Sequence, residues 1–367
     1  MRHIGTVLVW FMLAIPCSAE ASSCDGSWPL WQSFVKSYVL PSGRVVDLSE
    51  QAISTSEGQS YAMFSALVAN DRVQFDHLLN WTINNLAQGD LKRHLPSWRW
   101  GRTNEGGWKV LDINSASDAD IWIAYSLFHA AKKWGSNYYK ELATAMLRNI
   151  AKREVVDLPG VGSMLLPAPY GFSLTSDTWR LNPSYLPVQL LRYFALVDKE
   201  GPWNEMAQNT LLMIAATSRK GLVPDWVLYS VNKGFYLDAE RGGYTGYDAI
   251  RVYMWWTMLS KRDPLYNAIR PYLVEAAQYV QDETHLPERI SLLNGIQEGW
   301  ASSGIEAAWA PFRSVVFGQK HKIPTSFEVG DKYYDAVLGL LVYGWLEQRY
   351  QFEFNGGLLI GSKVCLN

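Results

Sequence analysis

The chain of 367 residues carries 33 Lys and Arg against 35 Asp and Glu, a formal net charge of −2 at pH 7. Because the two signs are interspersed, the sequence offers no basic stripe that could follow a phosphate backbone, and we expect no nucleic acid partner. The composition is unusual in its 17 Trp and 20 Tyr, more than a helical core needs. Flat aromatic faces suit sugar rings as well as protein cores.

The first residues have the pattern of a secretory signal peptide, which we assign to residues 1–21. A basic start is followed by an apolar run over residues 4–15 and by the small residues Ala19 and Ala21, which fit the position before a cleavage site. The run is too short to span a bilayer comfortably, and no later segment is apolar enough to do so. Residues 22–367 contain no linker-like tract, so we expect a single domain that is periplasmic or secreted.

Most predicted elements are helices of two kinds, which alternate along the chain. The enclosed kind is apolar almost all round and covers residues 57–70, 118–134 and 248–260. The amphipathic kind keeps its charged side chains to one face and begins near residues 72, 138 and 265. Further helices are expected at residues 28–40, 184–197, 203–218, 303–316 and 331–350. The alternation predicts helical hairpins in two concentric layers, a toroid of about a dozen helices.

Two longer connections interrupt the helices and read as β-hairpins. They cover residues 159–173 and 223–243, and the second is expected to turn at Asn232, Lys233 and Gly234. Long ordered connections often carry functional residues, so both are candidates for the surroundings of a site.

An acid stands at the start of each enclosed helix, three residues after a Ser or Thr. The pairs are Ser54 with Glu57, Ser115 with Asp118, and Thr245 with Asp248. Taken singly, each pair is typical of a capping box, which satisfies the free N–H groups of a helix start. Capping does not require burial, however, and each of these helices is predicted to be buried. If the enclosed helices share one direction, their three carboxylates converge at one end of the ring.

Converging carboxylates beside aromatic side chains suit the cleavage of a glycosidic bond. That reaction needs one protonated carboxyl group for the leaving oxygen and one ionised group for water or carbon. Trp98, Trp100 and Trp108 precede Asp118, and Tyr247 adjoins Asp248, although each ring is equally suited to core packing. A helix start favours the ionised form, so a proton donor there needs burial and a neighbouring negative charge to raise its pKa.

Cys24 and Cys365 are the cysteines that remain after the leader is removed, one near each end. An exported protein can oxidise them. A helical toroid closes by bringing its first and last helix pairs together, so we expect a disulfide that ties the amino-terminal helix to the tail. The alternative is that both ends are frayed and the thiols stay free.

Three segments at the candidate acids resemble glycoside hydrolase family 8. They are "TSEGQSYAMFSALVAND" at residues 55–71, "ASDADIWIAYSLFHAAKKW" at residues 116–134 and "YDAIRVYMWW" at residues 247–256. The similarity covers nearly the whole chain after the leader. Together with "CDGSWPLWQSFVKSYV", "GSMLLPAPYGF" and "LNPSYLP", it resembles most the periplasmic endo-1,4-β-glucanases of bacterial cellulose-synthesis operons.

The resemblance implies an all-α fold, an (α/α)6 toroid with short β-hairpin loops, and an inverting endo-1,4-β-glucanase that uses no metal or other cofactor. By position, it makes Glu57 the proton donor and Asp248 the base that activates water. Asp118 becomes the acid that holds the central sugar in a distorted shape. Direct attack by water leaves no covalent intermediate.

Substrate contacts are expected from Trp100, Tyr185, Tyr247 and Arg251. Arg251 follows Asp248 by three residues, on the same helical face, where its charge would keep that carboxylate ionised; the alternative is an ordinary surface ion pair. The expected partner is a β-1,4-glucan, with a cellulose synthase complex as a further candidate, and we expect a monomer.

Other functions remain open at this point. Members of the family also act on xylan, chitosan and mixed-linkage glucan. A glucan-binding component without turnover would keep the same cleft, although all three acids are present. A polysaccharide lyase on a similar toroid would need a basic site for uronates, whereas this site is acidic. The sequence lacks the serine elbow, phosphate-binding loop and metal-ligand spacing of other hydrolase classes.

Overall fold

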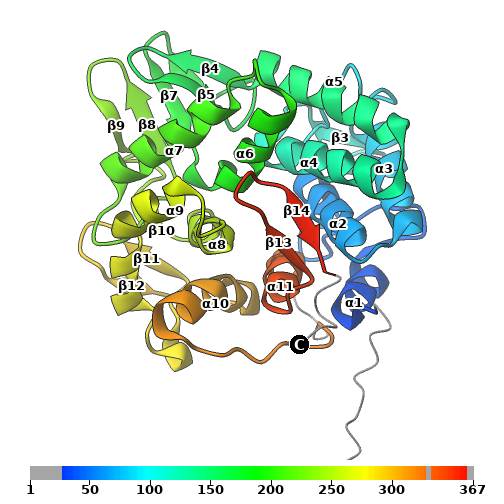
Figure 1. Cartoon of the computed structure of the whole chain (residues 1–367). Coiled ribbons are helices and arrows are strands. Elements are labelled where there is room, and N and C mark those ends of the chain that lie inside the picture. The colour runs from blue at the N-terminus through cyan, green and yellow to red at the C-terminus, as the bar shows by residue number, and fades with distance from the viewer. Residues whose placement is uncertain (1–26, 328–331, 362–367) are drawn as a thin grey trace, which may run out of the picture.

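The computed structural model describes residues 27–327 and 332–361, and the predicted signal peptide lies outside them. Eleven α-helices occur in this part, as the periodicity predicts, and Figure 1 shows them arranged around a ring. The inner layer consists of α2 (Ser56–Val68), α4 (Ser117–Trp134), α6 (Val188–Val197), α8 (Ile250–Met258), α10 (Ser303–Phe317) and α11 (Tyr333–Leu346). The outer layer consists of α1 (Pro29–Tyr38), α3 (Arg72–Asn85), α5 (Asn137–Arg153), α7 (Trp203–Thr217) and α9 (Pro264–Ile269).

The inner helices form a closed ring. Each packs on the next in the order α2, α4, α6, α8, α10 and α11, and α11 returns to α2. Outer helices cover them, α3 on α2, α5 on α4, α7 on α6 and α1 on α11, while a 3-10 segment at Val274–Tyr279 packs on α10. This arrangement is the expected (α/α)6 toroid.

Close approaches between inner helices at one end of the ring depend on glycine. A Cβ atom on Gly58 of α2 would lie 2.0 Å from the hydroxyl of Tyr333 on α11. One on Gly304 of α10 would lie 2.3 Å from the Cα atom of Asp335 on α11. The starts of α2, α10 and α11 can therefore pack together only because two of their first residues lack a side chain.

The other end of the ring is covered by a β-hairpin, β13 (Tyr350–Phe352) and β14 (Leu358–Ile360), which crosses the middle of Figure 1. The Tyr350 ring packs edge-on against Phe64 of α2, with centroids 4.9 Å apart. The hydroxyl of Tyr125 on α4 donates to the carbonyl oxygen of Gly356 in the hairpin turn at 2.7 Å. The hairpin thus fills the ring beside Phe64 and Tyr125, away from the starts of the inner helices.

Short antiparallel sheets make up the connections. They are β1 (Ser54–Thr55) with β2 (Arg99–Arg102) and β3 (Trp108–Asp112); β4 (Val155–Leu158) with β5 (Gly162–Leu165); β6 (Ser173–Thr175), β7 (Thr178–Leu181), β8 (Val227–Ser230) and β9 (Gly234–Leu237); and β10 (Tyr244–Thr245), β11 (Arg289–Ser291) and β12 (Gln297–Glu298). The β8–β9 hairpin was predicted, and Gly234 has the positive φ of 69° that its turn requires. The hairpin expected at residues 159–173 begins earlier, at β4, and β2–β3 was not predicted.

The two ends of the described chain meet at Arg349. Its Nη1 atom donates to the carbonyl oxygen of Ser27 at 3.0 Å, and its own carbonyl oxygen accepts from the N–H of Gly361 at 2.8 Å. Cys24 and Cys365 lie outside the described residues, so their pairing stays a prediction. Among the helices that the structure describes, none is long and apolar enough to cross a membrane.

Candidate active site

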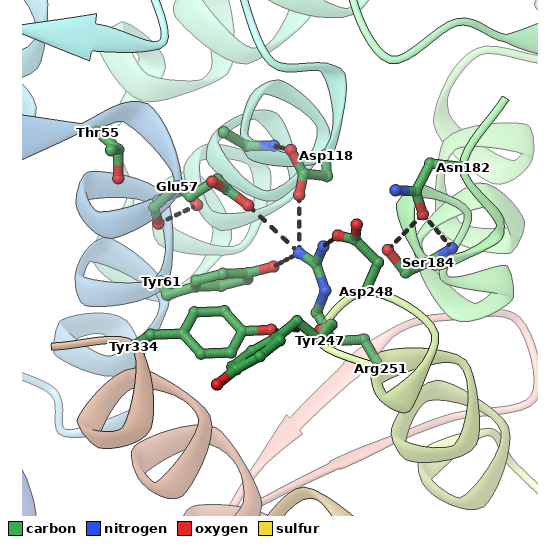
Figure 2. A network of polar contacts seen from close by, with 12 residues as sticks. Thr55, Glu57, Tyr61, Asp118, Asn182, Ser184, Tyr247, Asp248, Arg251 and Tyr334 are labelled. Atoms are coloured by element: carbon green, nitrogen blue, oxygen red, sulfur yellow. Dashed lines mark hydrogen bonds and ion pairs between the residues drawn. The ribbon is translucent and has the colours of Figure 1, made fainter. Parts of the chain in front are cut away.

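The three predicted acids converge at the amino-terminal end of the inner ring, which we call the mouth (Figure 2). Glu57 lies in the first turn of α2 and Asp118 in the first turn of α4. Asp248 stands in the turn that precedes α8, two residues before the helix begins at Ile250. The enclosed helices therefore do share one direction, as the sequence argument required.

Arg251 of α8 joins all three carboxylates. Its Nη1 atom donates to Asp118 Oδ2 at 2.9 Å and lies 3.3 Å from Glu57 Oε1, and its Nη2 atom donates to Asp248 Oδ1 at 2.7 Å. The guanidinium is buried, with its side chain 3% exposed, whereas the side chains of Glu57 and Asp248 are 29% and 27% exposed. Arg251 is thus the central cation of the site and not a surface pair.

The capping-box interpretation of the three pairs is wrong. Each Ser or Thr hydroxyl donates elsewhere, Ser54 to the Val45 carbonyl oxygen, Ser115 to Glu154 Oε1, and Thr245 to the Val223 carbonyl oxygen. Thr55, one residue later, caps α2 by accepting from the N–H of Gly58, and no side chain caps α4 or α8. The acids are consequently free to face Arg251.

Burial and charge set the protonation of two of these acids. Burial raises the pKa of Asp118 well above its ordinary value, the neighbouring Glu57 carboxylate adds to this, and Arg251 opposes it. Burial also raises the pKa of Asp248, against the opposing effect of Arg251. Among the described residues, no group of three or more His, Cys, Asp or Glu side chains is arranged to hold a metal ion.

Two predicted substrate contacts, Tyr185 and Tyr247, lie at the mouth with Arg251. The Arg251 guanidinium lies 5.5 Å from the centre of the Tyr185 ring. The Tyr247 ring is 42% exposed, and its hydroxyl donates to Glu288 Oε1 at 3.0 Å. Two further tyrosines, Tyr61 and Tyr334, lie beside these residues at the mouth and were not predicted from the sequence. Arg251 Nη1 donates to the hydroxyl of Tyr61 at 3.4 Å, and the hydroxyl of Tyr334 donates to the Tyr247 carbonyl oxygen at 2.6 Å.

Trp100, the remaining predicted contact, lies on β2 beside the strand that leads into Glu57. Its ring stacks on Trp108 with centroids 5.0 Å apart, meets Trp81 edge-on at 5.4 Å, and lies 4.4 Å from the guanidinium of Arg44. Trp108 is 45% exposed, whereas Trp100 is half-buried. Trp108 is therefore the more exposed ring of this stacked pair, and the role of Trp100 as a substrate contact stays a prediction.

Asp225 fixes the turn that carries Asp248, and the sequence analysis missed it. Its Oδ1 atom accepts the N–H of Gly246 at 2.9 Å and of Ala249 at 2.8 Å. Burial raises the pKa of Asp225 to about 7, and the charge of Asp248 contributes. The one available signal was its position in the long connection at residues 223–243, which was expected to be functional.

A second acidic cluster lies behind Asp118. Asp120 of α4 and Glu154, at the end of α5, are both fully buried, and their carboxyl groups lie against each other. Ser115 donates to Glu154 Oε1 at 2.5 Å. Burial raises the pKa of Glu154 to about 7 and that of Asp120 well above its ordinary value. Because burial disfavours the charged form of both groups, this pair favours a state in which at least one carboxyl group is protonated.

The chain is similar to known proteins over nearly its whole length. The family described as glycosyl hydrolases family 8 matches residues 5–348. An endoglucanase of Escherichia coli (strain K12) is 42% identical over 98% of this chain and 97% of its own length, and one of Salmonella typhi is 42% identical over 95% of each.

Solved structures give the same result. The crystal structure of an endo-1,4-D-glucanase from Vibrio fischeri ES114 is 36% identical, with a TM-score of 0.84 over 91% of this chain and 99% of the other. A cold-adapted family 8 xylanase, 18% identical with a TM-score of 0.66, shares the fold. The family match over residues 5–348 and the 42% identity over almost the full length show that this chain belongs to glycosyl hydrolase family 8.

Proposed function

We propose that the chain is an inverting endo-1,4-β-glucanase that hydrolyses internal bonds of cellulose. The observation that supports this most is the meeting of three carboxyl groups, from three inner helices, on the one guanidinium of Arg251 at the mouth. Relatives named endoglucanase, three of them 42% identical, support the reaction class, and the name of the Vibrio enzyme gives a 1,4 linkage.

Glu57 is the proposed acid and Asp248 the proposed base. In this scheme the proton of Glu57 passes to the glycosidic oxygen as its bond to C1 breaks. A water molecule bonds to C1 from the opposite face and gives its proton to Asp248. The Arg251 guanidinium stands between the two carboxyl groups, which supports a separation wide enough for that water, about 6.5–9.5 Å in inverting enzymes.

Asp248 and Asp118 suit different tasks because their surroundings differ. One oxygen of Asp248 is held by Arg251, and the side chain is partly exposed, so its other oxygen can receive a proton from water. Asp118 is almost fully buried, and its raised pKa favours the neutral form. We assign to Asp118 the holding of the central sugar through a hydrogen bond, without direct participation in bond breaking.

The test is the activity of the pure protein on a panel of carboxymethylcellulose, xylan, chitosan and mixed-linkage glucan. We expect reducing ends from carboxymethylcellulose, and proton NMR of a fresh digest should show the α-anomer first. A β-anomer appearing first would mean retention and a covalent intermediate. If reducing ends are released only from xylan or chitosan, cellulose is not the substrate. If none are released from any polysaccharide, the protein binds glucan without hydrolysing it.

Export and partners complete the proposal. Residues 1–21 are a signal peptide, residues 22–367 one catalytic domain, and the mature protein is a monomer that acts beside a cellulose synthase complex. The contact of Ser27 and Gly361 with Arg349 supports a Cys24–Cys365 disulfide, because it brings the neighbouring chain ends together. Amino-terminal sequencing of the exported protein and thiol titration under denaturing conditions test these points. Two free thiols per chain would exclude the disulfide.

A further inference from the structure

Asn182 is buried at the mouth in a fixed orientation. It lies between β7 and the 3-10 turn Pro183–Tyr185, and is 1% exposed. Its Oδ1 atom accepts two hydrogen bonds from Ser184, from the N–H at 3.0 Å and from the hydroxyl at 2.7 Å. Because both donors hold the oxygen, the Nδ2 atom must point the other way, toward Asp248, as Figure 2 shows.

The Nδ2 atom of Asn182 lacks a regular hydrogen-bond partner within residues 27–327 and 332–361, although it is buried. A buried donor left without a partner costs about 1–3 kcal/mol, so such a group is usually explained by a ligand or a reacting group. The group next to it is the carboxyl of Asp248. Burial raises the pKa of Asp248, and Asn182 is among the groups that lower it.

Asp248 has one oxygen to spare for this amide. Arg251 takes Oδ1, and an ionised carboxylate can accept about four hydrogen bonds over its two oxygens. Several other ionisable groups face Asp248. They are Arg251 on α8, Glu57 on α2, Asp225 in the connection before β8, Tyr185 before α6 and Tyr334 on α11. Apart from Arg251, each of these is an acid or a phenol, so Arg251 is the one cation among the groups named here.

We infer that Asn182 is a positioning residue for the proposed base: its Nδ2–H group donates to the Asp248 oxygen that Arg251 leaves free, and so holds the carboxylate on both sides. The inference rests on the proposed function, since it needs Asp248 to act as the base. The amide aligns the remaining lone pair of that oxygen with the attacking water. It also favours the ionised form that can accept a proton.

A purely structural role predicts a different outcome on substitution. The turn needs only an acceptor for Ser184, and an aspartate supplies it as well as an asparagine does. Asn182→Asp therefore keeps the turn, removes the donor and places a second negative charge beside Asp248. Asn182→Ala removes both acceptor and donor. Asn209→Asp is the matched control, because Asn209 of α7 is also buried and donates to the Ser163 carbonyl oxygen away from the mouth.

We expect Asn182→Asp to lower kcat about a hundredfold and to move the acid limb of the kcat/KM profile to higher pH, with KM within about threefold of the wild type. Asn182→Ala should show a smaller loss, about tenfold, in the same direction. Asn209→Asp should leave kcat and the acid limb unchanged. A folded Asn182→Asp enzyme with the kcat and acid limb of the wild type would overturn the inference, even if Asn182→Ala does not fold.

A titration separates this inference from the proposed function. Carbon-13 NMR of the Asp248 carboxyl group, in the wild type and in Asn182→Ala, needs no turnover. The Asp248 pKa should be higher in the variant, because a donor to the ionised form has been removed. An inactive wild type would reject the proposed function while the titration still decides the role of Asn182. If the Asp248 pKa is the same in both proteins, the positioning role of Asn182 is rejected, and the proposed hydrolysis of cellulose is left unaffected.

Discussion

Two groups of buried acids lie within two residues of each other at the start of α4, and they are neutralised in different ways. Asp118 faces the guanidinium of Arg251. Asp120, fully buried, faces the carboxyl group of Glu154. An ionised carboxylate buried without compensation costs several kcal/mol, so each group needs a positive charge or a proton.

The comparison distinguishes acids that can change their protonation state during a reaction from acids that have only a structural role. A guanidinium keeps its charge at every working pH, so the acids around Arg251 can gain and lose protons while the site stays compensated. The raised pKa values of Asp120 and Glu154 mean that this pair is compensated only while it keeps a proton. That pair, with Ser115, ties the segment before α4 to the end of α5 and thereby supports Asp118 from behind.

The largest expected effect separates the two groups by activity. Glu57→Gln and Asp248→Asn should each lower kcat about a thousandfold, because each removes proton chemistry without removing volume. Asp120→Asn makes the same kind of change two residues from Asp118 and should retain most activity. Kinetics on carboxymethylcellulose, with circular dichroism as the control for folding, measure this. If Asp120→Asn is as inactive as Asp248→Asn, the two groups of acids do not differ in their importance for activity.

Removal of the cation tests the first mode of compensation. Arg251→Met should lower the free energy of unfolding at pH 7 by about 3–5 kcal/mol, because three carboxyl groups lose their common partner. The loss should shrink as the pH falls and the acids become neutral. Urea titrations at pH 7 and pH 5 test both statements. An equal loss at the two values would show that lost packing, and not charge, causes it.

Removal of one acid from the pair tests the second mode. The pKa of folded Glu154 is raised to about 7, whereas the unfolded chain loses this proton near pH 4.5. The folded state therefore binds more protons between these values, and its stability falls as the pH rises from about 4.5 to about 7. Glu154→Gln should flatten this slope, with a difference on the order of 1–3 kcal/mol between pH 5 and pH 8. The measurement is the melting temperature of the wild type and of Glu154→Gln as a function of pH. If the two melting temperatures change in parallel, Glu154 does not carry the proton that causes the slope.

Asp225 shows a third mode, in which backbone N–H groups compensate the acid, and it should give the smallest effect. Asp225→Asn keeps an oxygen for the N–H groups of Gly246 and Ala249, so the turn should survive. Because its pKa is about 7, Asp225 is largely neutral at acidic pH, so the substitution should leave the acid limb of kcat/KM nearly in place, with kcat within about tenfold of the wild type. Asp225→Ala, which removes the acceptor, should be the more impaired variant. Equal kinetics for the two would show that the acceptor has no role in positioning Asp248.

Much of the fold could be read from the sequence because burial leaves a direct pattern. The absence of a polar stripe in α2, α4 and α8 predicted an inner ring, and the acids at their starts predicted a common mouth. Both predictions are confirmed by the arrangement of Glu57, Asp118 and Asp248. The family resemblance is confirmed by the match over residues 5–348.

The parts that could not be predicted depend on contacts between distant segments. The spacing of Ser115 and Asp118 is that of a capping box, and only the structure shows Ser115 bound to Glu154. Arg251 was paired with Asp248 from local spacing, but its contacts with α2 and α4 join residues more than 130 positions apart. Asn182 lies in a connection, where no periodicity marks an inward-facing side chain.

Because Ser27 and Gly361 both contact Arg349, the two ends of the described chain lie close together, and the arrangement of the helices does not depend on where the chain starts. A short linker could join the two ends without disturbing α1 or α11. New ends opened at the exposed turn around Gly160, between β4 and β5, would then give a circular permutant. Such a chain would start at β5 and still place Glu57, Asp118 and Asp248 around Arg251, since the ring and not the reading direction brings them together.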